Sequence, residues 1–187
     1  MKRADHSPGY RRLIDTNVHS LRKALDLLAR ISDEAYTESP SGFEPHRVGG
    51  HLRHILEFYE CFLDGLASGF INYDARRRNP LIQQSREYAM KSVCAVIRCL
   101  ESCHTLTTRP IIWVRMEDVA DAELCDLFLA SSFERELQVL SSHTIHHFAL
   151  IAMTLGAHGI TVDKDFGMAP STLRHLEQFT GAATCAR

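Results

Sequence analysis

The chain lacks the features that mark several large classes of protein. Its 187 residues contain no stretch that approaches the ~18 uncharged apolar residues needed to span a membrane. Residues 1–6 turn polar where a secretory signal would have an apolar segment, so we expect neither export nor membrane insertion. The net charge is -2, from 21 Lys and Arg against 23 Asp and Glu, so no overall positive field exists to hold a nucleic-acid backbone.

Common catalytic motifs are missing as well. The sequence has no G-x-S-x-G nucleophile elbow, no G-x-x-x-x-G-K phosphate loop and no dinucleotide fingerprint. Its six cysteines form no C-x-x-C pair, and we expect them to be reduced thiols of a cytoplasmic protein. Cys99 and Cys103, one helical turn apart and beside His104, suggest a soft-metal site, but small apolar filling of a helix is the favoured interpretation.

The composition is that of an ordinary globular domain, with 45% hydrophobic, 24% charged and 8% aromatic residues. A chain of this size buries about 70% of the surface that its unfolded form exposes, which is enough for a core without disulfides. We expect a single domain over residues 1–187, with its core at about 10–179.

Apolar residues recur at steps of three and four in four long segments, as amphipathic helices require. The first segment covers 10–37 and the second covers 47–65. The third begins at Asn79-Pro80, an N-cap followed by a first-turn proline, and continues through Leu100. The fourth is capped by Ser131 or Ser132, with Glu134 completing a capping box after Ser131, and ends at Gly156 or Gly159. A short helix follows from Pro170-Ser171 to about Phe179.

One segment departs from the helical pattern. Ile111 to Val114 are β-branched or aromatic and follow Pro110, so a short strand or hairpin is expected within 109–119, with 127–129 as a partner. Such a strand would present an edge suited to homodimer formation. The fold class that follows is all-α, an antiparallel four-helix bundle with this β-like segment before the last long helix.

Histidine is the unusual residue of this chain. There are 11, and His143 and His147 differ by ~40° around a helix, one turn apart, so they can chelate one ion. They are in register with Leu140 and Ile151, on the face that packs into the core. Two buried imidazoles need polar partners, which a metal ion supplies, although a hydrogen bond to a neighbouring helix is the ordinary role of one such histidine.

A third ligand is available from the second helix, where His51 and His54 lie three residues apart. Measured from Ile55 at the centre of the apolar stripe, His51 is ~40° off and His54 is ~100° off, so packing alone favours His51. His146 lies ~100° from His147 and is expected to pack rather than to bind. Three histidines would leave one coordination position open, as in catalytic zinc sites.

Four motifs resemble those of one known family, and they occur in its order and spacing. They are VGGHLRHIL at 48–56, NYDARRR at 72–78, HTIHH at 143–147 followed by Leu155 and Gly159, and FGMAPST at 166–172. Over about residues 13–176 the chain resembles the DinB/YfiT-like superfamily of metalloenzymes, helical bundles with a three-histidine metal site. The resemblance implies an up-down-down-up bundle, frequent homodimers, and the ligands His54, His143 and His147. His51 would then contact a ligand or face the substrate.

Other side chains are candidates for catalysis or substrate contact. Tyr73, Asp74 and Arg76 to Arg78 occupy a loop that could offer a phenol, a carboxylate and cations to an anionic substrate, although such arginines are commonly solvated. Glu57 and Glu60 follow His54 on the same helix and could orient a ligand or act as a base. The catalytic candidates are therefore Tyr73, Asp74, Glu57 and His51.

The expected function is that of a metal-dependent enzyme. The resemblance favours a divalent transition metal, zinc first and nickel or iron as alternatives, with transferase or hydrolase chemistry on a small molecule such as a thiol. Two other interpretations stay open, a non-catalytic stress-associated bundle with a structural metal or core histidines, and a small-molecule binding module. We expect no nucleic-acid or membrane partner.

Overall fold

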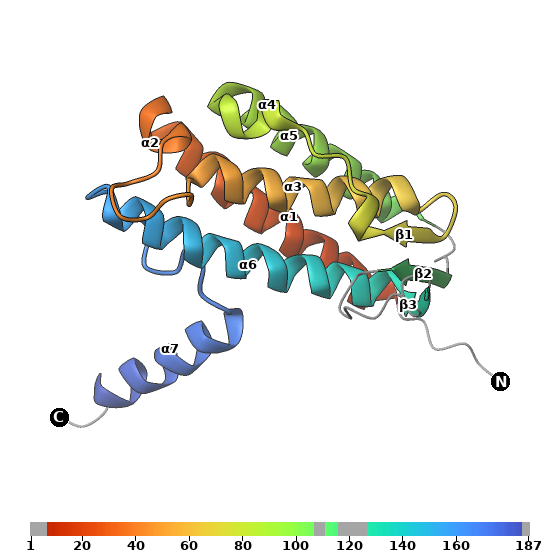
Figure 1. Ribbon diagram of the computed structural model, residues 1–187. Coiled ribbons are helices and arrows are strands. Elements are labelled where there is room, and N and C mark those ends of the chain that lie inside the picture. Colours follow the sequence, from red (N-terminus) through yellow and green to blue (C-terminus); the bar gives the residue numbers. More distant parts are fainter. Residues whose placement is uncertain (1–6, 107–110, 116–126, 185–187) are drawn as a thin grey trace.

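The computed structural model describes residues 7–106, 111–115 and 127–184, which are mostly helical (Figure 1). The α-helices are α1 (Ser7–Arg30), α2 (Asp33–Thr37), α3 (Val48–Gly65), α4 (Pro80–Gln84), α5 (Arg86–Ser102), α6 (Phe133–Ala157) and α7 (Pro170–Thr184). The described residues also contain two 3-10 turns, η1 (Tyr73–Ala75) before α4 and η2 (Cys103–Thr105) directly after α5. Among these residues, every helix is too short or too polar to cross a membrane.

Serine caps divide two of the expected helices. The hydroxyl of Ser32 accepts the Ala35 N–H, so the helix expected over 10–37 is α1 followed by the short α2. Asn79 caps α4 as predicted, but α4 ends at Gln84 because Ser85 is extended and caps α5 through the Tyr88 N–H. The prediction of one continuous helix was wrong at both places. A side-chain cap satisfies an otherwise unpaired N–H, and it competes with helix continuation.

The start of α6 corrects another detail. Ser132 is its N-cap and accepts the Arg135 N–H, whereas the hydroxyl of Ser131 donates to the Glu136 carboxylate at 2.5 Å. The capping box expected between Ser131 and Glu134 is therefore not formed. The helix ends at Ala157, just after Gly156, within the predicted range.

Of the four long helices, α1 packs against α5 and α6, and α3 packs against the same two helices (Figure 1). Buried apolar side chains from all four form a common core. The fully buried side chains include Ile14 and Leu21 of α1, Leu52, Ile55 and Phe62 of α3, Val93 and Leu100 of α5, and Leu137 and Leu155 of α6. Burial of such apolar surface is the main source of stability. The packing of α3 against α6 positions the histidines.

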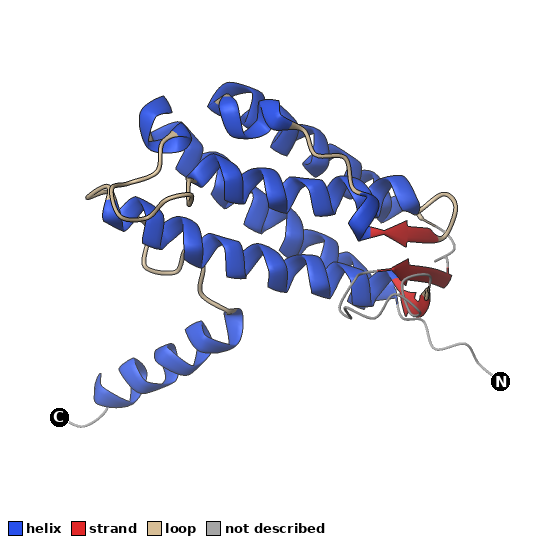
Figure 2. Cartoon of the chain, in the orientation of Figure 1, coloured by secondary structure: helices blue, strands red, loops and turns tan. Residues whose placement is uncertain are grey.

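A small sheet lies at one end of the helices (Figure 2). Its central strand β2 (Ile111–Arg115) pairs antiparallel with β3 (Leu129–Ser132) and parallel with β1 (Phe70–Asn72). The predicted strand is confirmed at Ile111–Arg115, and the rest of 109–119 lies outside the described residues. Its partner was expected at 127–129, but the strand begins at Leu129 and runs to Ser132, so only Leu129 was predicted correctly. The third strand, β1, was not expected, and it makes β2 a central strand. The strand edge suggested for dimer formation is therefore not offered by Ile111 to Val114.

Candidate metal centre

Three histidines from two helices meet between α3 and α6. One ring nitrogen each of His54, His143 and His147 lies within 4.8 Å of the other two. The ring centroids are 4.9 Å apart for His54 and His143, 4.7 Å for His54 and His147, and 4.5 Å for His143 and His147. All three side chains are half-buried. Imidazole is a preferred ligand of zinc, nickel and iron, and three ring nitrogens this close together form a group that could hold one ion.

A buried hydrogen-bond network sets the rotation of α6 that brings these rings inward. The Tyr59 hydroxyl donates to Oδ1 of Asn17 at 2.7 Å and lies 3.0 Å from the Thr144 hydroxyl. Asn17 in turn donates to the Leu137 carbonyl at 3.0 Å. The network ties α1, α3 and α6 together beside His143, so α6 cannot rotate without breaking buried hydrogen bonds.

Helix α3 contributes His54 to this group, whereas helical periodicity alone favoured His51. Helix α3 packs against α4 and α5 as well as α6, so the centre of its buried face is not the direction of α6. A residue well away from that centre can therefore reach the other two histidines. His51 instead places its Nδ1 3.2 Å from Nδ1 of His147. His146 is exposed, with its ring 5.1 Å from that of His147, and lies outside the group.

The environment keeps the three imidazoles neutral. Burial, followed by the charge of Arg76, lowers the pKa of His54 to about 4. Burial and then His54 lower the pKa of His143 to about 4, and burial and then His143 lower that of His147 to about 3. A metal binds the neutral form of histidine, so the lone pairs are available at pH 7.

Phe58 joins the histidines to the loop after β1, a role that the sequence did not reveal. Its ring centroid lies 4.9 Å from that of His54, 4.2 Å from that of His143 and 5.0 Å from that of Tyr73. The guanidinium carbon of Arg76 lies 4.8 Å from the same centroid, a cation–π distance. The position of Phe58, one turn after His54, is the feature that could have identified it.

Arg76 is held by several groups besides Phe58. It donates to the Tyr73 carbonyl at 2.6 Å and lies 3.8 Å from the Glu57 carboxylate. Glu57 is buried and also pairs with Arg53 at 3.2 Å, while burial raises its pKa. The carboxylate of Glu57 is therefore shared by two arginines, and it is not part of the three-histidine group. The predicted role of Glu57 as a base stays a prediction.

Tyr73 has its hydroxyl in a buried contact. It is fully buried and donates to Oε2 of Glu136 at 2.8 Å, while Ser131 donates to the other carboxylate oxygen. Sequence reasoning missed Glu136, although it lies one turn before Leu140 on the apolar stripe. Asp74 and Glu60, also candidates, are half-buried and do not join the histidines. Catalytic roles for Tyr73 and Asp74 stay predictions.

A separate hollow of about 250 Å³ lies beside α3 and β1. Its lining includes Glu57, Glu60, Cys61, Arg76 and Arg77, and none of the three histidines. The Cys61 thiol donates to the Asn72 carbonyl at 3.1 Å, and burial raises its pKa to about 11. Cys61 is therefore a thiol at neutral pH and not an activated nucleophile.

The cysteines of the suggested soft-metal site are not grouped with other ligands. Cys99 is exposed and Cys103 is buried, with the Cys103 thiol 3.4 Å from the Cys99 carbonyl oxygen. His104 lies 3.1 Å from the Asp15 carboxylate. Within the described ranges, the one group of three or more suitable ligands is His54, His143 and His147.

Comparison with known proteins gives little further information. No family model matches the chain. FK506-binding protein 5 of Rhizopus delemar is 32% identical over 109 residues, a match that covers 58% of this chain and 28% of that protein. The chain thus spans a little over a quarter of the length of this relative.

Proposed function

We propose that the chain is a DinB-like protein that binds a divalent transition metal through His54, His143 and His147. Zinc is the first candidate, with nickel and iron as alternatives, and the surrounding fold would be the antiparallel up-down-down-up four-helix bundle of that superfamily. The observation that carries the proposal is the approach of the three ring nitrogens to within 4.8 Å, from two helices far apart in sequence.

The polar atoms of the site fit a bound cation. Among the described residues, Nδ1 of His143 is buried without a hydrogen-bond partner. The three rings lie against one another, and those of His54 and His143 also lie against Phe58. An unpaired buried polar group costs free energy, and coordination to an ion repays part of that cost. The lowered pKa values of the three rings favour the same conclusion, because they remove competition from protons at pH 7.

Three ligands favour a reactive site over a purely structural one. Structural zinc sites are closed by four protein ligands, whereas catalytic sites keep a position for water or substrate. An ion held in this way lowers the pKa of bound water toward ~7 or stabilises a thiolate, which suits hydrolysis or thiol transfer on a small molecule. The chain's own part is to hold three neutral imidazoles in place and to keep Arg76 close by, where it favours an anionic ligand.

Metal analysis of the purified protein tests the proposal. The wild-type protein is expected to carry about one ion per chain, and His54→Ala, His143→Ala and His147→Ala to lose it. His146→Ala is the matched control, because it removes an exposed imidazole next to His147. Equal metal content in all five proteins, or a wild type that takes up no zinc, nickel or iron, would exclude this site.

Spectroscopy of the cobalt-substituted protein separates catalysis from the alternatives. A spectrum that changes when a thiol or azide is added indicates an open coordination position, and turnover of an added substrate then distinguishes an enzyme from a binding module. An unchanging spectrum with four protein ligands would favour the structural-metal alternative, a non-catalytic bundle. FK506 binding is not part of the proposal, because the relative's name refers to a protein of which this chain spans 28%.

A homodimer, implied by the family resemblance, is also proposed. Two apolar side chains of β2 are open to solvent, Ile111 at 73% and Trp113 at 41% exposure, and apolar groups exposed together favour association. Light scattering of wild type and Trp113→Ser tests the dimer. A monomeric wild type would exclude it, and an unchanged dimer in the variant would place the interface elsewhere.

A further inference from the structure

A fourth imidazole, that of His51, lies beside the three-histidine group. Nδ1 of His51 is 3.2 Å from Nδ1 of His147, and the ring centroids are 5.4 Å apart with an angle of 42° between the planes. Both side chains are half-buried. The distance is that of a hydrogen bond between two ring nitrogens, one of which must carry the hydrogen.

The chemistry of imidazole allows two arrangements. A neutral ring has one N–H and one lone pair, so either His147 donates to His51 or His51 donates to His147. If His147 donates from Nδ1, its Nε2 keeps a lone pair. If His51 donates, the Nε2 atom of His147 carries the hydrogen and cannot bind a cation. Only the first arrangement is compatible with His147 as a ligand.

We propose that His51 is a positioning residue of the metal centre, whose Nδ1 accepts a hydrogen bond from Nδ1–H of His147. The bond fixes the tautomer of His147 that leaves the Nε2 lone pair for an ion, and it holds the rotation of the ring. This inference rests on the proposed function, because it assigns a role to His51 within the same site. Metal-bound histidines commonly make such a hydrogen bond through their second nitrogen, most often to a carboxylate or carbonyl.

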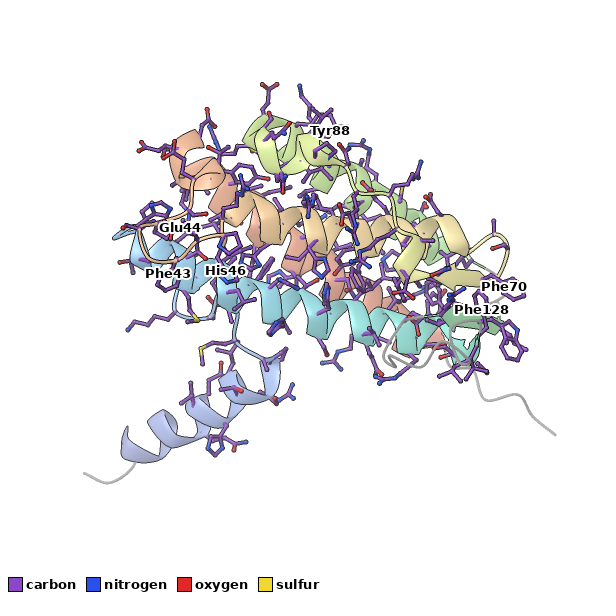
Figure 3. The ribbon with its side chains drawn as sticks, in the orientation of Figure 1. Phe43, Glu44, His46, Phe70, Tyr88 and Phe128 are labelled. Carbon is purple, nitrogen blue, oxygen red and sulfur yellow. The ribbon has the colours of Figure 1, made fainter. Side chains whose placement is uncertain are left out.

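The surroundings of His51 hold its ring in place for this role. The ring of His46, from the loop before α3, stacks on it with centroids 5.6 Å apart and an angle of 1° between planes. Figure 3 shows His46 beside the first turn of α3. The backbone N–H of His51 donates to the Arg47 carbonyl at 3.2 Å, within that first turn. The His51 side chain is thus confined between His46 and His147, and Nδ1 is the nitrogen that faces His147.

The position of His51 also explains why α3 would contribute one metal ligand rather than two. The nitrogen of His51 that approaches the site is directed at the Nδ1 atom of His147. His51 is absent from the group whose nitrogens lie within 4.8 Å of one another. In this arrangement His51 supports a ligand without closing the coordination sphere, so the open position postulated for the metal is preserved.

Long-range proton–nitrogen correlation NMR of the metal-free protein tests the tautomer of His147 directly. Long-range correlations from ring protons show which nitrogen of His147 carries hydrogen. We expect Nδ1–H in the wild type, a mixture of tautomers in His51→Ala, and Nδ1–H again in His51→Gln, whose carbonyl can accept the same hydrogen bond. Nε2–H in the wild type, or a His147 signal that His51→Ala leaves unchanged, would overturn the inference.

Metal affinity provides the second measurement. Competition with a chelator is expected to show a ~10–100-fold loss of Zn²⁺ affinity in His51→Ala, the range typical for removal of a group that supports a ligand. His51→Gln should recover part of it, and His146→Ala should match the wild type. Complete loss of Zn²⁺ in His51→Ala, together with full retention in His54→Ala, would identify His51 as a ligand and overturn the inference. A wild type that binds no metal would exclude the proposed function, while the NMR experiment would still decide the tautomer. Thermal unfolding confirms that each variant is folded.

Discussion

The hydroxyl of Tyr73 donates a 2.8 Å hydrogen bond to Oε2 of Glu136, and both side chains are buried, at 0% and 4% exposure. This bond ties η1 to the first turns of α6. Ser131, at the end of β3, donates to the second carboxylate oxygen. The contact therefore joins the loop that carries Arg76 to the helix that carries His143 and His147.

Tyr73→Phe is expected to destabilise the protein while leaving the ring packed on Phe58. Glu136 would lose one of its two hydroxyl donors inside the core, and an unsatisfied buried acceptor costs about 1–3 kcal/mol. Urea unfolding of wild type and variant measures the difference. Tyr88→Phe is the control, because Tyr88 is exposed at 37% and its hydroxyl accepts a hydrogen bond from Asn79 at the surface. If Tyr73→Phe abolished turnover with unchanged stability, Tyr73 would be catalytic.

Two adjacent glycines in α3 are expected to respond in opposite ways to alanine. A Cβ atom on Gly49 would lie 2.6 Å from the Gln83 carbonyl oxygen and 3.0 Å from Cε1 of Tyr36, so α3 and α4 would have to separate. Overpacking of this kind costs about 1–3 kcal/mol. At Gly50 the nearest atom is Cγ of Arg47 at 3.4 Å, on a flexible side chain. Gly50→Ala should gain up to ~1 kcal/mol from helix propensity.

Urea unfolding of the two variants measures both effects on the same helix turn. Because His51 and His54 lie within the next two turns, Gly49→Ala should also weaken Zn²⁺ binding, whereas Gly50→Ala should not. Equal stability of the two variants would show that the approach of α3 to Gln83 is looser than the structure indicates.

Local patterns in the sequence were sufficient to predict most of the helical structure. The starts of α4, α6 and α7 follow from Asn79, Ser132 and Pro170, because capping depends on residues only a few positions apart. The break at Ser85 was missed, since a serine within a periodic stretch is compatible with both a cap and a helix interior. Strand β1 was missed because it has three residues and its partner, β2, follows it by about 40 positions. Periodicity contains no information about such pairing.

The candidate site was predicted only in part, for a related reason. The pair His143 and His147 follows from helix geometry, which is local. The choice between His51 and His54 depends on how α3 is rotated relative to α6, which its contacts with α4 and α5 also decide. Periodicity gave the centre of the buried face, and the family resemblance supplied His54. Neither identified Phe58 or Glu136, whose roles depend on residues distant in the sequence.

Arg76→Gln is expected to raise the pKa of His54 and of His143 in the metal-free protein. The charge of Arg76 opposes protonation of both rings, although burial is the larger cause of their lowered pKa values. Both pKa values should therefore rise but stay below the ordinary 6.5. Arg77→Gln is the control, because Arg77 is exposed and pairs with Asp64 at 2.5 Å. Histidine titration by NMR measures the shifts, and identical titrations in the two variants would show that Arg76 does not act on the site.

The metal-free protein is expected to lose stability as the pH falls from about 6.5 to about 4. In this range the unfolded chain binds protons at His54, His143 and His147, whereas the folded chain, with pKa values of about 4, 4 and 3, does not. More protons on the unfolded state mean that the free energy of unfolding rises with pH, by at most ~1.4 kcal/mol per pH unit for each proton. Solvent around the half-buried rings makes the actual slope smaller.

Urea unfolding across this range should give a flatter profile for His147→Gln than for wild type, because one of the three proton sites is gone. His146→Gln, with its exposed imidazole replaced, should keep the wild-type profile. A wild type as stable at pH 4.5 as at pH 7 would contradict the neutral, half-buried histidine cluster on which metal binding depends.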